Sequence, residues 1–427
     1  MKYAITTLGC KVNQFETQAI ETMLQSRGHT PTDAGDADAV IVNTCAVTAE
    51  SGRKSRQAVR RMLTENPGAV AAVCGCFSQI EPDEIAALGA AVVFGSGDRK
   101  AFAEAVEKAV AEHQGARSID DPFKRTEMEF LPAGALEGRT RAYMKIEDGC
   151  DNFCTYCVIP YARGRVRSMP IADAQREAAR LQAEGFKEIV VTGIEISSYG
   201  KDFRDGSGLA DVLCAVAAAA QETRIRIGSI EPTVITEEFC RKLSAAGNIC
   251  RHFHLSLQSG CDRTLAAMHR KYDTARFYRS VELLRAYFPG CALTADLITG
   301  FPGETEKDFA ATLQFIQKVG FAAMHVFPYS VRPGTKAAEL PEQLTHAVKD
   351  SRARMAQKIA ADMQRAYLEA QIGKTLPVLF ETEQGECWQG HSDNYCEVCA
   401  VGENLHGIIK NVKITARNGK KLIGNIV

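Results

Sequence analysis

Apolar runs alternate with helical patterns through the first part of the chain. Runs rich in valine, isoleucine and alanine occupy residues 2–8, 39–42, 69–73 and 91–94. Helical spacing of polar and apolar positions covers residues 13–27, 50–63 and 99–111. This alternation of strand and helix predicts an α/β fold, with a small doubly wound parallel sheet over residues 1–115. Sheets of this kind place ligands at the carboxyl ends of their strands.

A second set of strand patterns begins after a break. Residues 112–139 are polar, contain two prolines and show no sustained period, so we expect a linker there. Strand candidates then recur at residues 142–146, 188–192, 224–228, 252–257, 292–298 and 322–327. Helical patterns such as 172–184 and 274–287 separate them. These units predict a partial (β/α)6 barrel over residues 136–368, with its chemistry at the carboxyl-end loops.

The pattern changes again toward the C-terminus. A long charged helical pattern over residues 345–370 ends at Gly373, and alternating residues with frequent turns follow. Residues 371–427 are too few for a sandwich of two sheets, and they predict a small closed β-barrel.

Composition narrows the possible functions. The 51 basic and 52 acidic side chains nearly cancel, so attraction to a polyanion must come from local patches. No apolar run approaches the roughly 20 residues that a membrane span needs, and no signal-peptide pattern opens the chain. We therefore expect a cytoplasmic protein with no membrane partner. Disulfides do not persist in that reducing compartment, so clusters among the 15 cysteines indicate metal or redox sites.

The strongest motif is Cys150-x-x-x-Cys154-x-x-Cys157, directly after the first strand of the predicted barrel. Three thiolates in one loop can bind three irons of a [4Fe-4S] cluster and leave the fourth iron open for a ligand. Structural zinc is the alternative, but it needs four ligands, and no second Cys pair or His pair lies nearby in the sequence. The loop therefore predicts a catalytic iron-sulfur centre.

Three more cysteines, Cys10, Cys45 and Cys76, closely follow the first three predicted strands. Because parallel strands align their carboxyl ends, we expect these side chains to converge at one edge of the sheet and to hold a second cluster. Cys74 is an alternative to Cys76, but it lies at the end of the strand itself, where a buried core position is expected.

The other cysteines occur in helix, strand or turn patterns without a convergent partner, and core packing is the interpretation for most of them. They are Cys214, Cys240, Cys250, Cys261, Cys291, Cys387, Cys396 and Cys399. Cys396 and Cys399 fall within one alternating pattern, which places their side chains on opposite faces of a strand.

The segments around these cysteines resemble the methylthiotransferase family of radical S-adenosylmethionine (SAM) enzymes over essentially the whole chain. The matching segments are TTLGCKVNQFE, VNTCAVT, GCFSQ, KIEDGCDNFCTYCVIPYARGRVRS, TGIEISSYGKD, IGSIEP, HLSLQSGCDRTLAAMHRKY and DLITGFPGET. The terminal segment with GHSDNYCEVCAV resembles a TRAM domain, a small RNA-binding β-barrel. The resemblance implies an N-terminal methylthiotransferase domain, a radical SAM core and a TRAM domain.

The segment KVNQ resembles the branch of this family that converts N6-threonylcarbamoyladenosine at position 37 of tRNA to its 2-methylthio derivative. The isopentenyladenosine branch typically reads GCQMN here, and the branch that modifies a ribosomal-protein aspartate reads GCPKN. Methylthiolation of those substrates is the alternative within the family. A noncatalytic iron-sulfur redox sensor that binds RNA is the alternative of a different class.

The resemblance also implies cofactors and partners. These are two [4Fe-4S] clusters, S-adenosylmethionine, and an electron donor such as flavodoxin or ferredoxin. In the family, one S-adenosylmethionine methylates sulfur at the N-terminal cluster. Another is cleaved at the loop cluster, and the resulting radical abstracts hydrogen from C2 of the adenine.

Residues at the ends of later barrel strands are candidates for binding S-adenosylmethionine and substrate. Gly193 and Glu195 follow the second strand, where the superfamily that this chain resembles carries a turn that binds the methionyl amine. The other candidates are Ser229, Glu231, Ser256, Gln258 and Asp296. Arg270 is a candidate to pair with the methionyl carboxylate, and a solvated helix position is its alternative.

Basic residues near the C-terminus predict an RNA surface. From Asn404 onward the chain has five cations and no acid, which suits a phosphate backbone. The five are Lys410, Lys413, Arg417, Lys420 and Lys421. Further candidates for this surface are Arg53, Lys54, Arg56, Arg60, Arg61, Arg163, Arg165 and Arg167. Trp388 and Tyr395 are candidates for stacking on bases, with a core position as the alternative.

Overall fold

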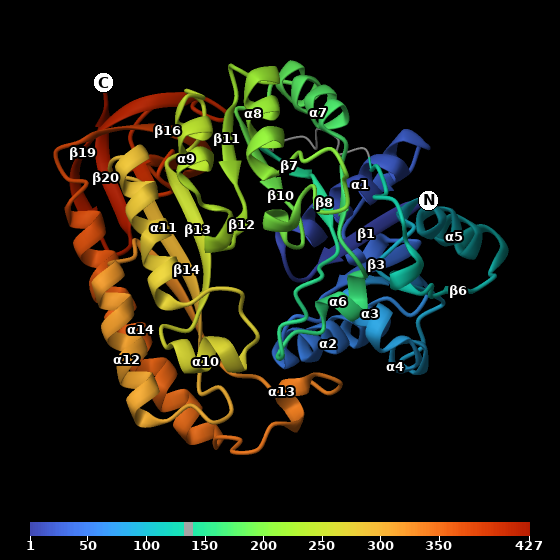
Figure 1. Ribbon diagram of the computed structural model, residues 1–427. Helices are drawn as coiled ribbons and strands as arrows, with labels where there is room; N and C mark the ends of the chain where they lie inside the picture. The colour runs from blue at the N-terminus through green and yellow to red at the C-terminus, as the bar shows by residue number, and fades with distance from the viewer. Residues whose placement is uncertain (132–139) are drawn as a thin grey trace.

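The computed structural model describes residues 1–131 and 140–427. Its N-terminal part is a six-stranded parallel sheet in the order β2-β1-β3-β4-β5-β6 (Figure 1). The strands are β1 (Lys2–Thr7), β2 (Thr30–Pro31), β3 (Ala39–Thr44), β4 (Val70–Gly75), β5 (Val92–Phe94) and β6 (Ala116–Ser118). The expected strands and the parallel sheet are confirmed.

Helices cover both faces of this sheet. Helices α1 (Lys11–Ser26) and α5 (Arg99–Glu112) pack on one face, against Ile41 and Ala72. Helices α2 (Ala49–Glu65), α3 (Cys76–Ile80) and α4 (Pro82–Ala87) contribute to the core on the other face, with Val40 and Val73. Neighbouring residues of one strand point to opposite faces, so fully apolar strands fill both cores. The doubly wound arrangement is confirmed.

Part of the expected linker belongs to this sheet. Strand β6 lies within residues 112–139 and pairs with β5. Arg125 then anchors the following segment, because its guanidinium group donates to Asp120, to Ser96 Oγ at 2.9 Å and to Gln79 Oε1 at 3.1 Å. A three-residue strand is too short to show a period, which is why the sequence pattern suggested only a linker. Residues 132–139 of the expected linker lie outside the described residues.

The central part contains the six expected strands in order. They are β7 (Arg141–Lys145), β10 (Glu188–Thr192), β11 (Arg224–Ile227), β13 (His252–Gln258), β14 (Ala292–Thr299) and β15 (Ala323–Pro328). The helices of this part include α7 (Ile171–Ala183), α8 (Leu209–Ala219), α9 (Glu237–Ser244), α11 (Thr274–Tyr287), α12 (Glu306–Val319) and α14 (His346–Glu369). All the strand pairs of this array are parallel.

The central strands form an open barrel. One sheet has the order β11-β10-β7, and a second has the order β12-β13-β14-β15, where β12 (Ser229–Ile230) directly continues β11. Strand β7 is at an edge of this array and lies against α1 of the N-terminal part. The partial barrel is therefore confirmed, and the N-terminal sheet lies beside it (Figure 1).

The C-terminal part is a closed five-stranded barrel, as expected. Its strands are β16 (Thr375–Gln384), β17 (Cys387–Ser392), β18 (Glu397–Ala400), β19 (Ile409–Asn418) and β20 (Lys421–Ile426). Its core, which includes Val378, Phe380 and Val398, also receives Leu368 from the end of α14. The architecture is consistent with a TRAM domain.

A buried charge cluster fixes this barrel to the central part. The fully buried Glu188 carboxylate pairs with Arg224 at 2.5 Å and with Arg226 at 2.8 Å. Burial alone would raise the pKa of Glu188, but these two cations lower it below its usual range. Arg226 also donates to the backbone carbonyl oxygens of Ser392 and Asp393 at 3.1 and 3.0 Å. The ends of β10 and β11 are thereby tied to the C-terminal barrel.

One expectation about the cysteines is wrong. Cys387 and Cys399, which were expected to lack convergent partners, form a disulfide between β17 and β18. The antiparallel register places Gln389 opposite Cys399, so Cys387 is a diagonal neighbour on the same face. Sequence spacing alone does not reveal this register. Cys396 precedes β18 and is buried in the barrel core.

Within the described residues, no helix combines the length and apolar character needed to cross a membrane.

Candidate active site

A cavity of about 700 Å³ lies between the carboxyl-end edge of the N-terminal sheet and the interior of the partial barrel. Its walls include all three N-terminal cysteines that follow strands. The barrel residues that line it include Thr192, Gly193, Ser229, His252, His254, Ser256, Thr294, Asp296 and His325. Tyr395 of the C-terminal barrel also lines it, so all three parts of the chain meet at one cavity.

The three N-terminal cysteines follow three neighbouring strands. Cys10 caps the start of α1 after β1, Cys45 follows β3, and Cys76 begins α3 after β4. Asn13 holds two of these loops together, because its Nδ2 donates to the carbonyl oxygens of Leu8 at 2.8 Å and Thr44 at 2.9 Å. The expected convergence of Cys10, Cys45 and Cys76 at one sheet edge is therefore present in the structure.

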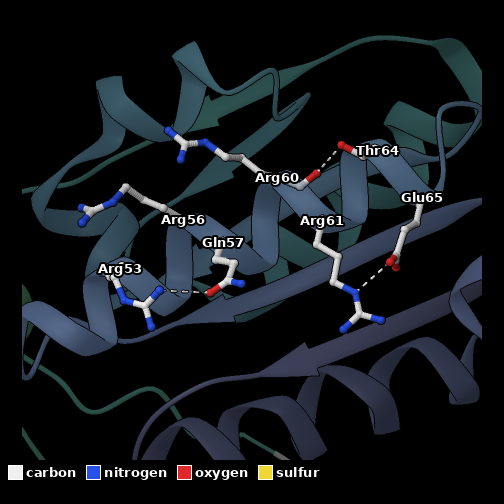
Figure 2. Close-up of a pocket in the computed structure, with 7 residues that line it drawn as sticks. All are labelled: Arg53, Arg56, Gln57, Arg60, Arg61, Thr64 and Glu65. Carbon is white, nitrogen blue, oxygen red and sulfur yellow. Dashed lines mark hydrogen bonds and ion pairs between the residues drawn. The ribbon is translucent and has the colours of Figure 1, made fainter.

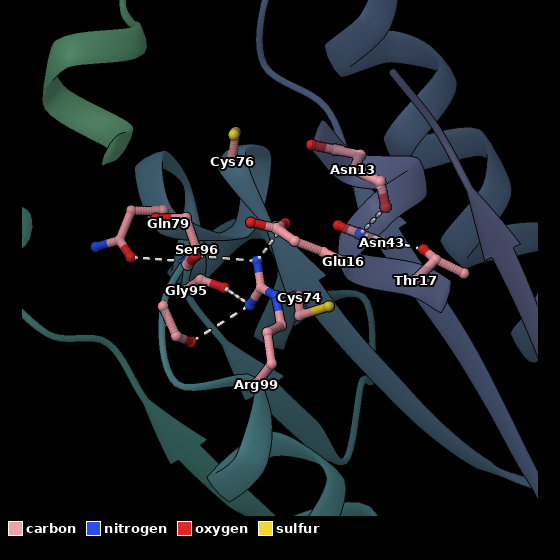
Figure 3. A network of polar contacts seen from close by, with 12 residues as sticks. Asn13, Glu16, Thr17, Asn43, Cys74, Cys76, Gln79, Gly95, Ser96 and Arg99 are labelled. Atoms are coloured by element: carbon pink, nitrogen blue, oxygen red, sulfur yellow. Dashed lines mark hydrogen bonds and ion pairs between the residues drawn. The ribbon is translucent and has the colours of Figure 1, made fainter. Parts of the chain in front are cut away.

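Cys74 has a different environment. It is fully buried in β4 and packs in the core between the sheet and helices α1 and α5. Cys76 belongs to the core on the opposite face and lines the cavity (Figure 3). Gly75 makes the sharp turn between them with φ 106°, where a Cβ atom would lie 2.4 Å from the Thr44 carbonyl oxygen. The expectation that Cys74 is a core residue is confirmed.

The second cysteine set lies in the loop between β8 (Glu147–Asp148) and α6 (Ile159–Arg163). Gly149, at φ 92°, allows this loop to leave the strand, because a Cβ atom there would collide with the Arg165 carbonyl oxygen. The Ile159 N–H donates to Cys157 Sγ at 3.4 Å, and Arg270 Nη1 donates to Cys154 Sγ at 3.1 Å. Donors of this kind stabilise thiolates, which are the protonation state that iron requires.

The donor chemistry of both sets fits iron-sulfur clusters. All six cysteines are free thiols. Burial raises the pKa of Cys45 and Cys76, and it raises the pKa of Cys157 to about 12, so binding of iron there must release protons. Across residues 1–131 and 140–427, no three Cys, His, Asp or Glu side chains converge on a single metal ion. A cluster instead binds each cysteine to a different iron.

Arg163 of α6 connects the two cysteine sets. Its Nε donates to Cys76 Sγ at 3.1 Å, its Nη2 donates to Asn13 Oδ1 at 3.2 Å, and it pairs with Glu16 of α1. Glu16 also pairs with Arg99 at 2.9 Å (Figure 3). Burial alone would raise the pKa of Glu16, but Arg163 and Arg99 lower it to about 2. The last residue of the helix that follows the cysteine loop therefore contacts a cysteine of the other set.

This placement corrects one expectation about RNA binding. Arg163 and Arg167 are buried and bond within the protein, so neither extends an RNA surface. Arg165 is exposed and pairs with Asp151 at 3.6 Å. The sequence pattern of alternating arginines could not show that Arg163 is neutralised by the buried Glu16 carboxylate, because Glu16 is 147 residues away in the sequence.

The predicted cofactor-binding residues separate into two groups. Gly193, Ser229, Ser256 and Asp296 line the cavity. Glu195, Glu231 and Arg270 form a cluster of their own beside the cysteine loop. Gln258 is at an irregularity of β13, with φ 63°, and does not line the cavity.

The second group is a buried ion-pair cluster. Arg270 and Glu231 pair at 2.5 Å, and the Asn152 amide of the cysteine loop donates to Glu231 at 3.3 Å. Burial and the Glu231 carboxylate raise the pKa of Glu195 to about 7, and Arg270 partly offsets them. Arg270 is not a solvated helix residue, because it lies beyond the end of α10 (Asp262–Ala267) and its side chain is only 5% exposed. Pairing of Arg270 with a methionyl carboxylate stays a prediction.

Sequence reasoning missed several polar residues of the cavity, among them Lys11, His252, His254 and His325. His252 Nε2 and His254 Nδ1 are each hydrogen-bonded to Thr294 Oγ1 at 2.9 Å. His254 Nε2 also lies 3.2 Å from an Asp296 carboxylate oxygen. Burial and the nearby Arg226 lower the pKa of His252 well below its usual value, so this imidazole is neutral. The alternation in His252-Phe-His254-Leu-Ser256 was the available signal, since it places three polar side chains on one face of a strand.

The C-terminal cations form a weaker positive surface than their number suggested. Arg417 pairs with Glu369 at 3.1 Å, and Lys421 pairs with Glu397 at 3.0 Å. Lys413 donates to the Gly373 carbonyl oxygen at 2.5 Å. Lys410 and Lys420 are exposed and have no ion-pair partner among the described residues. Acids from other strands and from α14 therefore neutralise part of the strip.

Two aromatic candidates for stacking on bases already have protein partners. Tyr395 stacks on His252 and His391 at ring distances of 4.7 and 5.0 Å, and the Arg226 guanidinium lies over its ring. Trp388 packs against the core of the C-terminal barrel. Tyr395 is nevertheless 38% exposed and lines the cavity, so its stacking on a base stays a prediction.

Helix α2 carries the other basic surface. Its exposed face forms a shallow depression of about 490 Å³ lined by Arg53, Arg56, Gln57, Arg60, Arg61, Thr64 and Glu65 (Figure 2). Acids close to the helix neutralise most of these cations: Arg53 pairs with Glu50 at 2.7 Å, and Arg61 pairs with Glu65 at 2.9 Å. Arg60 has no ion-pair partner in the part of the chain that the structure describes.

Known proteins match this chain along nearly all of its length. The Radical SAM superfamily matches residues 144–316, and the family described as Uncharacterized protein family UPF0004 matches residues 2–95. A threonylcarbamoyladenosine tRNA methylthiotransferase MtaB of Bacillus subtilis is 38% identical over 420 residues, which are 96% of this chain and 93% of that protein. A tRNA-2-methylthio-N(6)-dimethylallyladenosine synthase of Pelotomaculum thermopropionicum is 33% identical over 435 residues, which are 99% of this chain and 97% of that protein.

A solved structure shows the same fold. The radical S-adenosylmethionine methyltransferase TsrM from Kitasatospora setae, with cobalamin and a [4Fe-4S] cluster bound, has a TM-score of 0.59 and 17% identity. The match covers 79% of this chain and 77% of that chain.

A three-cysteine loop after the first strand of a partial barrel defines a radical SAM enzyme. With an N-terminal sheet that carries three further cysteines and with relatives of this similarity, the chain belongs to the radical SAM methylthiotransferase family. Membership implies a [4Fe-4S] cluster and S-adenosylmethionine as cofactors, and the donor chemistry of Cys150, Cys154 and Cys157 fits such a cluster.

Proposed function

We propose that this enzyme converts N6-threonylcarbamoyladenosine at position 37 of tRNA to its 2-methylthio derivative. The observation that carries the proposal is the shared cavity, which has the N-terminal cysteines on one wall and residues of the barrel strands on the other. A substrate base between these walls lies against the N-terminal cysteines, and Cys157 of the loop is close enough to Cys76 for their charges to interact. The full-length similarity to relatives named threonylcarbamoyladenosine tRNA methylthiotransferase supports this choice of base. Modification of dimethylallyladenosine is the second candidate, supported by a relative of 33% identity.

A second [4Fe-4S] cluster, at Cys10, Cys45 and Cys76, is part of the proposal. When bound, the two clusters and S-adenosylmethionine supply the sulfur, the methyl group and the radical chemistry. The chain supplies the ligands and their surroundings: Arg163 donates to Cys76, Arg270 donates to Cys154, and Asn13 fixes the loops beside Cys10 and Cys45. The Arg163 bond joins the helix that follows the cysteine loop to the N-terminal set, and the other two bonds orient their own sets.

The remaining partners follow from the same proposal. The tRNA lies along Lys410 and Lys420 of the C-terminal barrel, with Arg60 of α2 as a further phosphate contact. An external electron donor such as flavodoxin or ferredoxin reduces the loop cluster. We place the enzyme in the cytoplasm, where tRNA and these donors occur, and we expect the Cys387–Cys399 pair to be reduced there.

Replacing Cys76 tests the assignment of the N-terminal ligands. We expect anaerobically reconstituted parent protein to hold about eight irons per chain, and Cys76→Ala to hold about four, because one cluster loses a ligand. Cys74→Ala is the matched control, since Cys74 is two residues away and packs in the core. Iron loss in Cys74→Ala with full iron in Cys76→Ala would reverse the assignment.

A deletion strain tests the reaction itself. Mass spectrometry of its tRNA nucleosides should show loss of 2-methylthio-N6-threonylcarbamoyladenosine and accumulation of the unmethylthiolated nucleoside. The parent gene and the Cys214→Ala variant should restore the product, because Cys214 is half-buried and lies on α8 away from the cavity, whereas Cys150→Ala should not. Loss of 2-methylthio-N6-dimethylallyladenosine instead, with accumulation of N6-dimethylallyladenosine, would support the second candidate, and an unchanged tRNA profile would exclude both.

The C-terminal surface predicts a specific salt dependence. Each lysine that contacts a phosphate contributes about one unit to the slope of log affinity against log salt. Lys410→Ala with Lys420→Ala should therefore lower the slope for tRNA binding by about two units. Lys421→Ala should change the slope less, because the Lys421 ammonium group already pairs with Glu397. An unchanged slope in the double variant would move the RNA surface to Arg60 and its neighbours on α2.

A further inference from the structure

Lys11 occupies an unusual position in the active-site cavity. It is the first residue of α1, adjacent to Cys10, and its half-buried side chain lines the cavity. In the part of the chain that the structure describes, its ammonium group has no hydrogen-bond or ion-pair partner. A half-buried cation without a partner is costly, because it has lost much of its water and gained no opposite charge.

The charges around Lys11 add to this cost. The guanidinium groups of Arg226 and Arg141 are close enough to destabilise its positive charge, and Glu188 is the nearby acid. Glu188 already pairs with Arg226 at 2.8 Å and Arg141 at 3.9 Å, in addition to Arg224. The donors of Arg226 are further used on backbone carbonyl groups of the C-terminal barrel. Lys11 therefore differs from Arg141, Arg224 and Arg226 in that its charged group remains free to bind a ligand in the cavity.

The neighbouring wall is polar and presents a second unpaired group. His252 lines the cavity close enough to Lys11 to interact with its charge. Its Nε2 is paired with Thr294, but its Nδ1 is buried and has no hydrogen-bond partner among the described residues. Buried polar atoms are paired in the large majority of cases, so an unpaired one at a cavity wall indicates a ligand atom. An unpaired ammonium group and a free imidazole nitrogen together suit a ligand with a carboxylate and a hydroxyl or amide group.

We infer that Lys11 binds the carboxylate of the threonylcarbamoyl group on the substrate adenosine, with His252 as a second contact to that group. This inference rests on the proposed function and names the part of the substrate that the cavity recognises. The threonylcarbamoyl group carries one carboxylate, one hydroxyl and two amide N–H groups, whereas a dimethylallyl group has no charge and no hydrogen-bonding atom. Lys11 is thus a specificity-determining residue, and it acts on substrate binding, not on the iron chemistry.

Binding of two matched RNAs tests the inference. One is the anticodon stem-loop with threonylcarbamoyladenosine at position 37, and the other carries the methylamide of the threonine, which removes the negative charge. The parent should bind the acid about tenfold to a hundredfold more tightly than the amide, which is the effect of one hydrogen bond to a charged group. Lys11→Gln should weaken binding of the acid by this factor and leave the amide unchanged. Lys11→Arg should keep most of the preference, and Lys100→Gln, an exposed lysine of α5, should behave as the parent.

Three further measurements separate the possible causes. Iron content and uncoupled cleavage of S-adenosylmethionine should be the same in Lys11→Gln and the parent. A raised KM for S-adenosylmethionine in that cleavage would assign Lys11 to the methionyl carboxylate and overturn the inference. Equal weakening for acid and amide would indicate a tRNA phosphate or a structural role, and would also overturn it. If the parent binds the acid selectively but forms no methylthio product on that RNA, the proposed function fails while the recognition by Lys11 stands.

Discussion

The structure depends on one buried carboxylate, Glu16, which joins the two halves of the active site. Arg163 reaches it from the end of α6, which follows the cysteine loop, Arg99 from the start of α5, and Lys145, at 3.6 Å, from the end of β7. Removing one partner of such a buried cluster typically costs about 3–5 kcal/mol, because the remaining charges are left uncompensated. The N-terminal sheet therefore cannot shift relative to the barrel without breaking these pairs. Because Arg163 also donates to Cys76, the same constraint sets the position of a cysteine ligand.

A fixed relation between the two parts explains why the cavity has two different walls. Parallel strands of the N-terminal sheet lead into Cys10, Cys45 and Cys76, and parallel strands of the barrel contribute Ser256 and Asp296 from within their length. These two walls enclose about 700 Å³, which is room for a base and part of its side chain. The C-terminal barrel is fixed to the same frame by Glu188 and its arginines, so an RNA held there has a defined path to the cavity.

The sequence predicted those features that have a long period or a local motif. The barrel strands, the closed terminal barrel and the placement of both cysteine sets followed from alternation and from strand ends. Features that depend on distant partners could not be predicted. The pairing of Cys387 with Cys399 depends on strand register, burial of Arg163 depends on Glu16, and neutralisation of Arg417 depends on Glu369 of another element. Strand β6 was missed because three residues show no period.

The central claim is that the two cysteine sets hold neighbouring clusters beside one cavity, in a relation fixed by Arg163. Pulsed electron paramagnetic resonance with both clusters reduced measures their magnetic dipolar coupling directly. The account predicts a single well-defined coupling in the parent and in Arg165→Met, an exposed arginine two residues along the loop. Arg163→Met, with iron content preserved, should give a broadened or weakened coupling because the contacts to Glu16 and Cys76 are lost. Absence of coupling in the fully reduced parent, or an unaltered coupling in Arg163→Met, would contradict the account.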